Sequence, residues 1–243
     1  MEIEYVKTVV VLSGQIRSFS DCLASQRWQV YRRLTRPVFF VSCAKDEQAK
    51  DAEKLRDFYP DVYIEVVEQP QSLVLPRWQA PRFPRIAHPY PVSASHDGIL
   101  KQLWSLNRAW AFAKDAVADG DTVIRIRPDL LFRRFEMPWS QGHNEAYLPT
   151  WSRWGGVNDR FAVLGSSAAF WYFSTFQRLQ DLCDIGAPLH PESLVMGSLE
   201  LGGVKIHNTL VADFSTLRMN GEFVGPDYQI WDIMDLTGRS RPY

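Results

Sequence analysis

Near its middle the chain reads Asp121-Thr-Val-Ile-Arg-Ile-Arg-Pro-Asp-Leu-Leu-Phe132, an apolar strand pattern that runs directly into charged residues. Arg125 and Arg127 are two positions apart, so on a strand their side chains share one face. Pro128 has no amide hydrogen for a strand ladder, so it ends the strand and leaves Asp129 in irregular backbone. Because ligands of open α/β sheets bind outside the carboxyl ends of the strands, we expect a cleft here for an anion or its metal ion. A surface Arg–Asp ion pair that closes the strand explains the same residues about as well.

A second strand pattern opens the chain and ends in a polar turn. Residues 6–12 form a continuous apolar run, typical of a strand covered on both faces, and Ser13-Gly-Gln-Ile-Arg-Ser18 follows. Gly14 permits close backbone approach, Ser13 offers a hydroxyl, and Arg17 offers a forked cation that suits a diphosphate. One glycine after one strand is not a phosphate-binding fingerprint, so an ordinary strand-to-helix turn fits this segment about as well.

Strand and helix patterns alternate along the first half, which predicts parallel strands joined by right-handed crossovers. The strands expected after the first are 37–43, 62–67 and 121–127, and the helices are 20–34, 47–58 and 95–114. After residue 132 shorter strands are expected at 146–149, 160–164 and 204–211, with helices at 170–183 and 190–202. The fold class is therefore predicted as α/β, one domain over residues 1–243, with a mostly parallel central sheet flanked by helices and a small antiparallel addition in the second half. Residues 69–91 carry six prolines in a loop of a length that is usually functional or mobile.

Composition narrows the possible partners. The chain has 243 residues, 46% of them hydrophobic, which is enough for a full core, and its net charge of −1 argues against nucleic acid or an anionic membrane as the main partner. Three cysteines without paired spacing indicate reduced thiols. No stretch approaches the roughly 18 apolar residues of a membrane span, and no secretory signal is visible, so we expect a soluble, cytoplasmic protein.

Four further polar side chains are candidates for a site, and each has a plainer explanation. Gln102 lies off the apolar stripe of its helix, where it lines a cleft or faces water. Glu192 falls in the first turn of a predicted helix, where a carboxylate also complements the helix dipole. Asp159 precedes a short strand, as turn residues do, and His207 lies within a late strand, where histidine is more often structural than a ligand.

The order of these parts resembles that of nucleotide-sugar-dependent glycosyltransferases of the GT-A type, over most of the chain. The matching pieces are the Val-Val-Val-Leu-Ser-Gly-Gln-Ile-Arg-Ser opening, the long helix before Ile-Arg-Ile-Arg-Pro-Asp129, the Gly-Gly-Val-Asn-Asp159-Arg-Phe-Ala loop and the His-Pro-Glu192-Ser helix start. The chain is most similar to small glycosyltransferase-like proteins of bacterial surface-polysaccharide clusters and large DNA viruses.

The resemblance implies an inverting hexosyl- or deoxyhexosyltransferase of polysaccharide biosynthesis, which moves the sugar of a nucleoside-diphosphate donor to a glycan or other hydroxyl acceptor. It implies a donor half at 1–132 and an acceptor half at 133–243. The donor site is then expected at Ser13, Gly14, Arg17, Gln102, Arg125, Arg127 and Asp129.

The resemblance also raises the question of a metal ion. In the wider class this strand usually ends Asp-x-Asp, and the two carboxylates bind a divalent cation that bridges the donor diphosphate. Arg127 occupies the first aspartate position here. Either Asp129 holds Mg²⁺ or Mn²⁺ almost alone, with His207 resembling in position a third ligand of some relatives, or Arg127 neutralises the diphosphate in the ion's place.

An inverting transfer needs a base for the acceptor hydroxyl, and Glu192 is the preferred candidate, with Asp159 as a contact for the acceptor or donor sugar. Two other classes of function stay open. A sugar nucleotidyltransferase is expected to carry a glycine-rich loop after the first strand, and residues 13–18 are poor in glycine. A non-catalytic carbohydrate- or nucleotide-sugar-binding protein explains the nine tryptophans but not the arginines.

Overall fold

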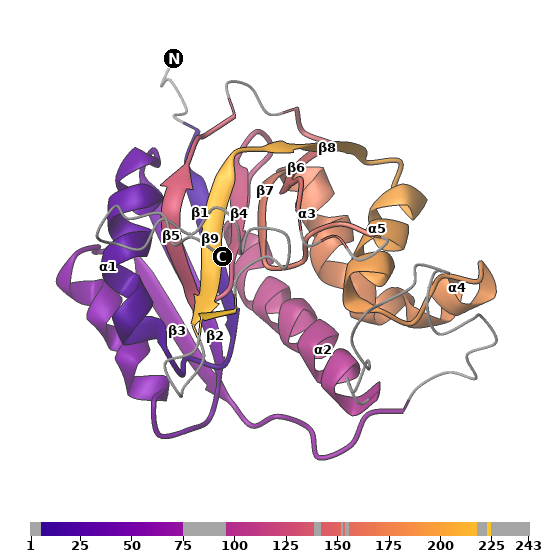
Figure 1. The fold of residues 1–243 in the computed structure, drawn as a ribbon, viewed down its shortest axis with the longest axis horizontal. Coiled ribbons are helices and arrows are strands. Elements are labelled where there is room, and N and C mark those ends of the chain that lie inside the picture. Colours follow the sequence, from indigo (N-terminus) through magenta and orange to yellow (C-terminus); the bar gives the residue numbers. More distant parts are fainter. Residues whose placement is uncertain are drawn as a thin grey trace, which may run out of the picture.

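A computed structural model describes residues 6–74, 96–138, 142–151, 153, 156–217 and 223–224, and its centre is a seven-stranded sheet (Figure 1). The strands of this sheet are β1 (Thr8–Gly14), β2 (Pro37–Ala44), β3 (Val62–Val67), β4 (Thr122–Ile126), β6 (Glu145–Pro149), β7 (Phe161–Gly165) and β8 (Lys205–Leu210). Their order across the sheet is β3-β2-β1-β4-β7-β6-β8. The first four pair in parallel, β7 runs antiparallel to both β4 and β6, and β6 is parallel to β8. The predicted α/β class with a mostly parallel sheet is confirmed.

A small antiparallel sheet lies against one face of the central one. It consists of β5 (Leu130–Phe135), β9 (Ala212–Leu217) and β10 (Phe223–Val224), with β9 in the middle. The expected antiparallel addition is therefore present, but other strands than the expected ones form it, because the segments expected at 146–149, 160–164 and 204–211 became β6, β7 and β8 of the central sheet. The segment that forms β9 follows β8 after one residue, with no turn signal between them. The last residue of β9 lies close to the turn after β4, since the Leu217 amide donates to the Asp129 carbonyl oxygen at 2.9 Å.

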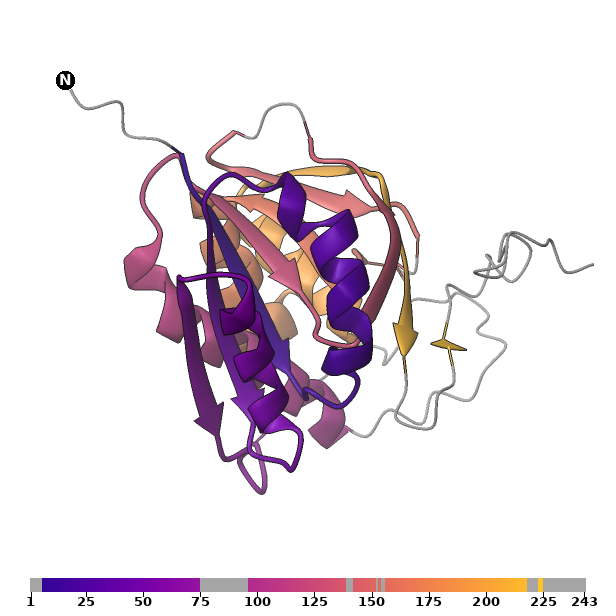
Figure 2. The same cartoon turned by 90° about the vertical axis from the view of Figure 1, so that its left-hand side faces the viewer.

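Helices cover both faces of the central sheet (Figures 1 and 2). One face carries α1 (Phe19–Gln29) and a 3₁₀ helix at Ala49–Asp57, and the other carries α2 (His96–Ala113), α3 (Ser166–Phe173), α4 (Leu179–Asp184) and α5 (Pro191–Leu201). Strand β1 explains why the first apolar run does not alternate. Val9 and Val11 pack toward the α2 side, whereas Val10 and Leu12 pack toward the α1 side, and all four side chains are fully buried.

Three predicted helices differ from those observed, and side-chain hydrogen bonds accompany the change in two of them. The helix expected at 20–34 ends at Gln29 and is followed by a 3₁₀ helix at Tyr31–Arg33, held by the Tyr31 hydroxyl, which donates to Gln26. The segment at 47–58 is the 3₁₀ helix named above. The helix expected at 170–183 begins earlier and is interrupted by a 3₁₀ helix at Ser174–Arg178, whose first serine donates back to the Phe170 carbonyl.

The expectations for the proline-rich loop and for a membrane span can be compared only with the described residues. Most of the proline-rich loop, from residue 75 on, lies outside them. No helix in the described ranges combines the length and apolar character that crossing a bilayer requires.

Candidate functional site

A cleft of about 310 Å³ opens at the carboxyl ends of β1 and β4, beside the start of α2. All seven residues expected at the donor site line it: Ser13, Gly14, Arg17, Gln102, Arg125, Arg127 and Asp129. The carboxyl ends of neighbouring parallel strands meet at one edge of a sheet, so residues far apart in sequence converge there. The other lining residues are Gln15, Gln69, Gly98, Lys101, Ser105, Pro128 and Leu217, which the sequence pattern did not single out for the site.

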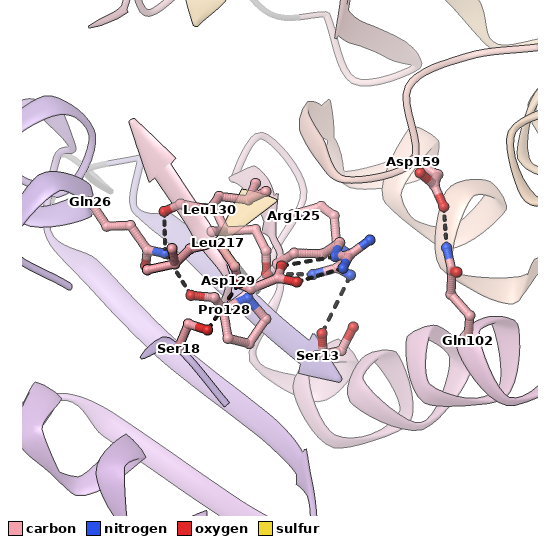
Figure 3. Close-up of polar contacts among 12 residues, drawn as sticks. Ser13, Ser18, Gln26, Gln102, Arg125, Pro128, Asp129, Leu130, Asp159 and Leu217 are labelled. Carbon is pink, nitrogen blue, oxygen red and sulfur yellow. Dashed lines mark hydrogen bonds and ion pairs between the residues drawn. The ribbon is translucent and has the colours of Figure 1, made fainter. Parts of the chain in front are cut away.

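Arg125 is the most unusual side chain of the cleft. It lies within β4, flanked by β1 and β7, and is only 2% exposed. Its guanidinium donates to the backbone carbonyls of Ile126 and, at 3.4 Å, of Ser13 (Figure 3). Within the described ranges it forms no ion pair with a carboxylate, and its Nε, the Ser13 Oγ and the Tyr172 hydroxyl lack hydrogen-bond partners. Burial lowers the pKa of Arg125 to about 10, so the charged side chain is held at an energetic cost that a bound anion would offset.

Arg127 and Asp129 form a two-pronged ion pair at the rim of the cleft. Arg127 donates from Nε at 3.0 Å and from Nη2 at 2.6 Å to the two carboxylate oxygens of Asp129. Burial alone would lower the pKa of Arg127, but the charge and hydrogen bonds of Asp129 outweigh it and raise that pKa. Arg127 lies just past the last residue of β4, its amide donates to the Arg160 carbonyl at 3.1 Å, and both Arg125 and Arg127 line the cleft. The expected ion pair exists, but it lines the cleft and is not fully exposed.

The charge of the cleft wall is strongly positive. Among the described residues its lining contains four cationic side chains, Arg17, Lys101, Arg125 and Arg127, and one carboxylate, that of Asp129. Lys101 also contacts Asp97, one helical turn away, at 2.6 Å. The wall therefore suits an anion that carries more than one charge.

The residues present do not fit a divalent cation. Both oxygens of Asp129 accept hydrogen bonds from Arg127, a neighbour that repels a cation. His207 lies on β8, three strands away from β4, where it stacks on Tyr147 and lies 3.5 Å from a carboxylate oxygen of Glu145. Strands are spaced by roughly 4.8 Å and metal ligands lie within about 2.6 Å of the ion, so His207 and Asp129 cannot share one. Among the residues that the structure describes, no cluster of three or more potential His, Cys, Asp or Glu ligands occurs.

Asp159 and Glu192 lie behind the wall of the cleft and not on its described lining. Asp159 is 3% exposed and accepts a hydrogen bond from Gln102, which itself lines the cleft (Figure 3). Glu192 is 5% exposed, and its Oε2 lies 2.7 Å from Nδ1 of His190. The sequence pattern did not anticipate this histidine, which directly precedes α5.

The loop that carries Asp159 packs tightly against the start of α5. The Val157 amide donates to the Glu192 carbonyl at 3.1 Å, and a Cβ atom at Gly156 would lie 2.1 Å from that same carbonyl oxygen. Only glycine leaves room for this approach at position 156, so Gly156 allows the loop to hold Asp159 near Glu192.

The His190–Glu192 pair predicts how stability depends on pH. Burial raises the pKa of Glu192, and the charge of Asp159 raises it further against the opposing bond from His190. Burial alone would lower the pKa of His190, but Glu192 outweighs it and raises that pKa above 6.5. The folded-state pKa values of both His190 and Glu192 exceed their unfolded-state values. The stability that this pair contributes is therefore complete at low pH and is lost as the pH rises through the folded-state pKa values.

Glu192→Gln removes this titration. The difference in melting temperature between the variant and the wild type (variant minus wild type) is therefore expected to increase as the pH is raised from about 5 to about 8. Differential scanning calorimetry over that range measures the effect. Glu200→Gln, an exposed carboxylate on the same helix, is the matched control and should give a constant difference. Parallel curves for Glu192→Gln and the wild type would contradict the assignment.

Comparisons with known proteins place the chain near glycosyltransferase structures at low similarity. No protein-family model matches it, and no curated protein does. The glycosyltransferase GlyE of Streptococcus pneumoniae TIGR4 is 14% identical over 84% of this chain and 45% of that chain, with a TM-score of 0.44. The galactosyltransferase LgtC, solved with donor and acceptor sugar analogs, is 15% identical over 82% of this chain and 72% of that one, with a TM-score of 0.47. An active-site mutant of LgtC is 14% identical over 82% and 71%, with a TM-score of 0.44. The chain thus spans less than half the length of GlyE, and its function must be argued from the residues of its own cleft.

Proposed function

We propose that the chain transfers a glycosyl unit from a nucleoside-diphosphate sugar to a glycan or other hydroxyl acceptor. The observation that carries this proposal is Arg125, a buried cation that lines the cleft and has no carboxylate ion-pair partner among the described residues. When the glycosyl bond breaks, negative charge develops on the leaving diphosphate. A guanidinium already fixed in a poorly solvated cleft stabilises that charge without reorganisation of solvent.

The composition of the cleft supports a donor site formed by the first half of the chain. Its described lining comes from residues 13–129, except for Leu217 of β9. Gly14 has a φ of 116°, which favours glycine, and the space that a Cβ atom would fill is open. Its backbone can therefore approach a phosphate closely. The volume of about 310 Å³ lies at the lower end of the range for small-molecule sites.

The two carboxylates behind the cleft are proposed to serve the acceptor. Gln102 lines the cleft, Asp159 is hydrogen-bonded to Gln102, and the charge of Asp159 raises the pKa of Glu192. A carboxylate whose pKa is raised toward neutrality is a better general base than an ordinary one. We therefore assign proton removal from the acceptor hydroxyl to Glu192 and contact with a sugar to Asp159, in a transfer that inverts the anomeric centre.

A panel of nucleotide sugars and nucleoside diphosphates tests the proposal by thermal shift, because a ligand that binds only the folded state raises the melting temperature. At least one compound is expected to stabilise the protein, and its sugar should then pass to an acceptor glycan or, slowly, to water. Stabilisation by free glycans alone would indicate a carbohydrate-binding protein instead. Release of pyrophosphate from a nucleoside triphosphate and a sugar phosphate would indicate a nucleotidyltransferase.

Arg127→Ala is expected to weaken donor binding by about 1.5 to 3 kcal/mol, or roughly 10- to 150-fold, the range for a hydrogen bond to a charged group. The variant also leaves Asp129 without its partner, which adds repulsion toward a diphosphate. Isothermal titration calorimetry measures the change. Arg134→Ala is the control, because Arg134 lies on β5, is 66% exposed and pairs with Glu136 outside the cleft. Equal affinities for Arg127→Ala and the wild type would remove Arg127 from the site.

A further inference from the structure

We propose that the cleft binds the donor diphosphate with arginine and lysine side chains in place of a divalent cation. The proposal rests on the proposed function and concerns how the same site neutralises its substrate. Three independent features of the described residues lead to it: the balance of charge along the lining, the engagement of Asp129, and the distance of the other potential ligands from the cleft.

The balance of charge is already sufficient for a diphosphate. Among the described residues the cleft presents four cationic side chains and one carboxylate, and with Lys101 also paired with Asp97 a surplus of cations still remains for two linked phosphates. A site that recruits a divalent ion has the opposite balance, because carboxylates must first attract the metal. Adding such an ion beside Arg125 and Arg127 would bring like charges together before any substrate is bound.

Both carboxylate oxygens of Asp129 bind Arg127, which leaves neither of them for a metal ion. Its two oxygens accept the Nε and Nη2 hydrogens of Arg127 in a fork, which fixes the plane of the guanidinium at the rim of the cleft. The Nη1 of Arg127 is not part of this fork, and the buried Nε of Arg125 has no hydrogen-bond partner among the described residues. Asp129 is accordingly a positioning residue.

The other carboxylates near the cleft are also occupied. Asp159 accepts the amide of Gln102, and Glu192 lies 2.7 Å from His190. A metal ion at Asp129 would therefore have to break an existing ion pair and find its other ligands elsewhere. Guanidinium and ammonium groups, by contrast, already line the space that the diphosphate would occupy.

The test measures the binding of UDP, GDP, ADP, CDP and dTDP by titration calorimetry, in buffer with excess EDTA and in buffer with millimolar Mn²⁺ or Mg²⁺. At least one diphosphate is expected to bind in EDTA, with an affinity within about threefold of that measured with metal. Binding that appears only with the metal, or that strengthens more than tenfold with it, would overturn the inference and leave the proposed function standing. If no diphosphate binds in either buffer, the proposed function and the inference both fail.

Asp129→Asn supplies a second readout in EDTA. The substitution removes the one negative charge among the described lining residues and retains an oxygen that accepts from Arg127, so the best-binding diphosphate is expected to bind a few-fold more tightly. In a site held by a metal ion the same variant loses a ligand, and affinity would fall by tenfold or more in the presence of Mn²⁺, an outcome that contradicts the inference. Glu136→Gln, an exposed carboxylate outside the cleft, is the matched control, and circular dichroism confirms that each variant is folded.

Discussion

Replacing Arg125 by methionine is expected to lower donor affinity by at least a hundredfold and, in the same protein, to raise the thermal stability of the ligand-free state. Both effects arise from one cause. A buried guanidinium without a carboxylate partner in the described residues is unfavourable for the folded chain and favourable for a bound anion. Methionine has a similar length and no charge, so it fills the space and removes both the cost and the attraction.

Two opposing effects, the cost of burying the Arg125 charge and the hydrogen bonds that the variant loses, set the sign of the stability change. The fall in the pKa of Arg125 from 12.5 to about 10 corresponds to a cost on the order of 3 kcal/mol for the charged form. The two hydrogen bonds to backbone carbonyls that the variant loses contribute about 1 kcal/mol each. A net gain of about 1 kcal/mol remains, or roughly 2 to 4 °C in melting temperature for a chain of this size.

Calorimetry without ligand and titration with the donor measure the two effects separately. Arg133→Met is the control, because Arg133 pairs with Asp213 outside the cleft, and its loss should leave donor affinity unchanged. Unchanged donor affinity in Arg125→Met would refute the role of Arg125. A marked loss of stability would show that the guanidinium holds the fold together through contacts stronger than those described.

The second large effect is expected at Glu192. Glu192→Gln should lower the catalytic rate by at least a hundredfold while leaving donor affinity nearly unchanged, because a general base acts in the transition state more than in the ground state. Asp159→Asn should instead weaken substrate binding, since its carboxylate fixes Gln102 at the cleft wall. Steady-state kinetics with varied donor and acceptor separate the two, and the anomeric configuration of the product, read by NMR, shows whether the transfer inverts.

Other outcomes for the two substitutions would change the assignment. If Glu192→Gln keeps near-normal turnover and Asp159→Asn abolishes it, the two roles must be exchanged. If neither substitution matters, a retaining transfer without a dedicated base, or no catalysis, becomes the better account. Glu200→Gln, exposed on the same helix, controls for a general effect of neutralising a carboxylate there.

Most of the residues that line the cleft were predictable because they follow strands with strong local signals. The apolar runs that become β1 and β4 have no polar alternation, and Pro128 marks where β4 stops. Parallel pairing then brings the two strand ends together regardless of the more than one hundred residues between them. The hydrogen-bond register is uniform along this pair, so strand order alone brings Ser13, Gly14, Arg125 and the residues just after β4 together, whereas Gln102 reaches the cleft from α2.

The arrangement of residues behind the cleft wall was less predictable because tertiary contacts determine it. No periodicity indicates that His190 would pair with Glu192, or that Gly156 would let a loop approach α5 so closely. His207 was expected near Asp129, but sequence alone does not show that two further strands separate β8 from β4. Strand β9 was missed for the same reason, since its partner β5 lies some eighty residues earlier in the chain.

A hydrogen bond joins residues that are far apart in the chain, which affects how the protein folds during synthesis. The Ser18 hydroxyl donates to the Leu217 carbonyl at 2.9 Å, across 199 positions, and the Leu217 amide reaches the turn at Asp129. During synthesis the ribosome releases β1 to β4 long before β9, so the nascent chain can assemble most of its large sheet while the cleft still lacks the lining contributed by Leu217. We expect nascent chains arrested before residue 212 to resist proteolysis in the sheet and yet to retain nucleotides poorly, which would keep a half-made protein from sequestering its substrate.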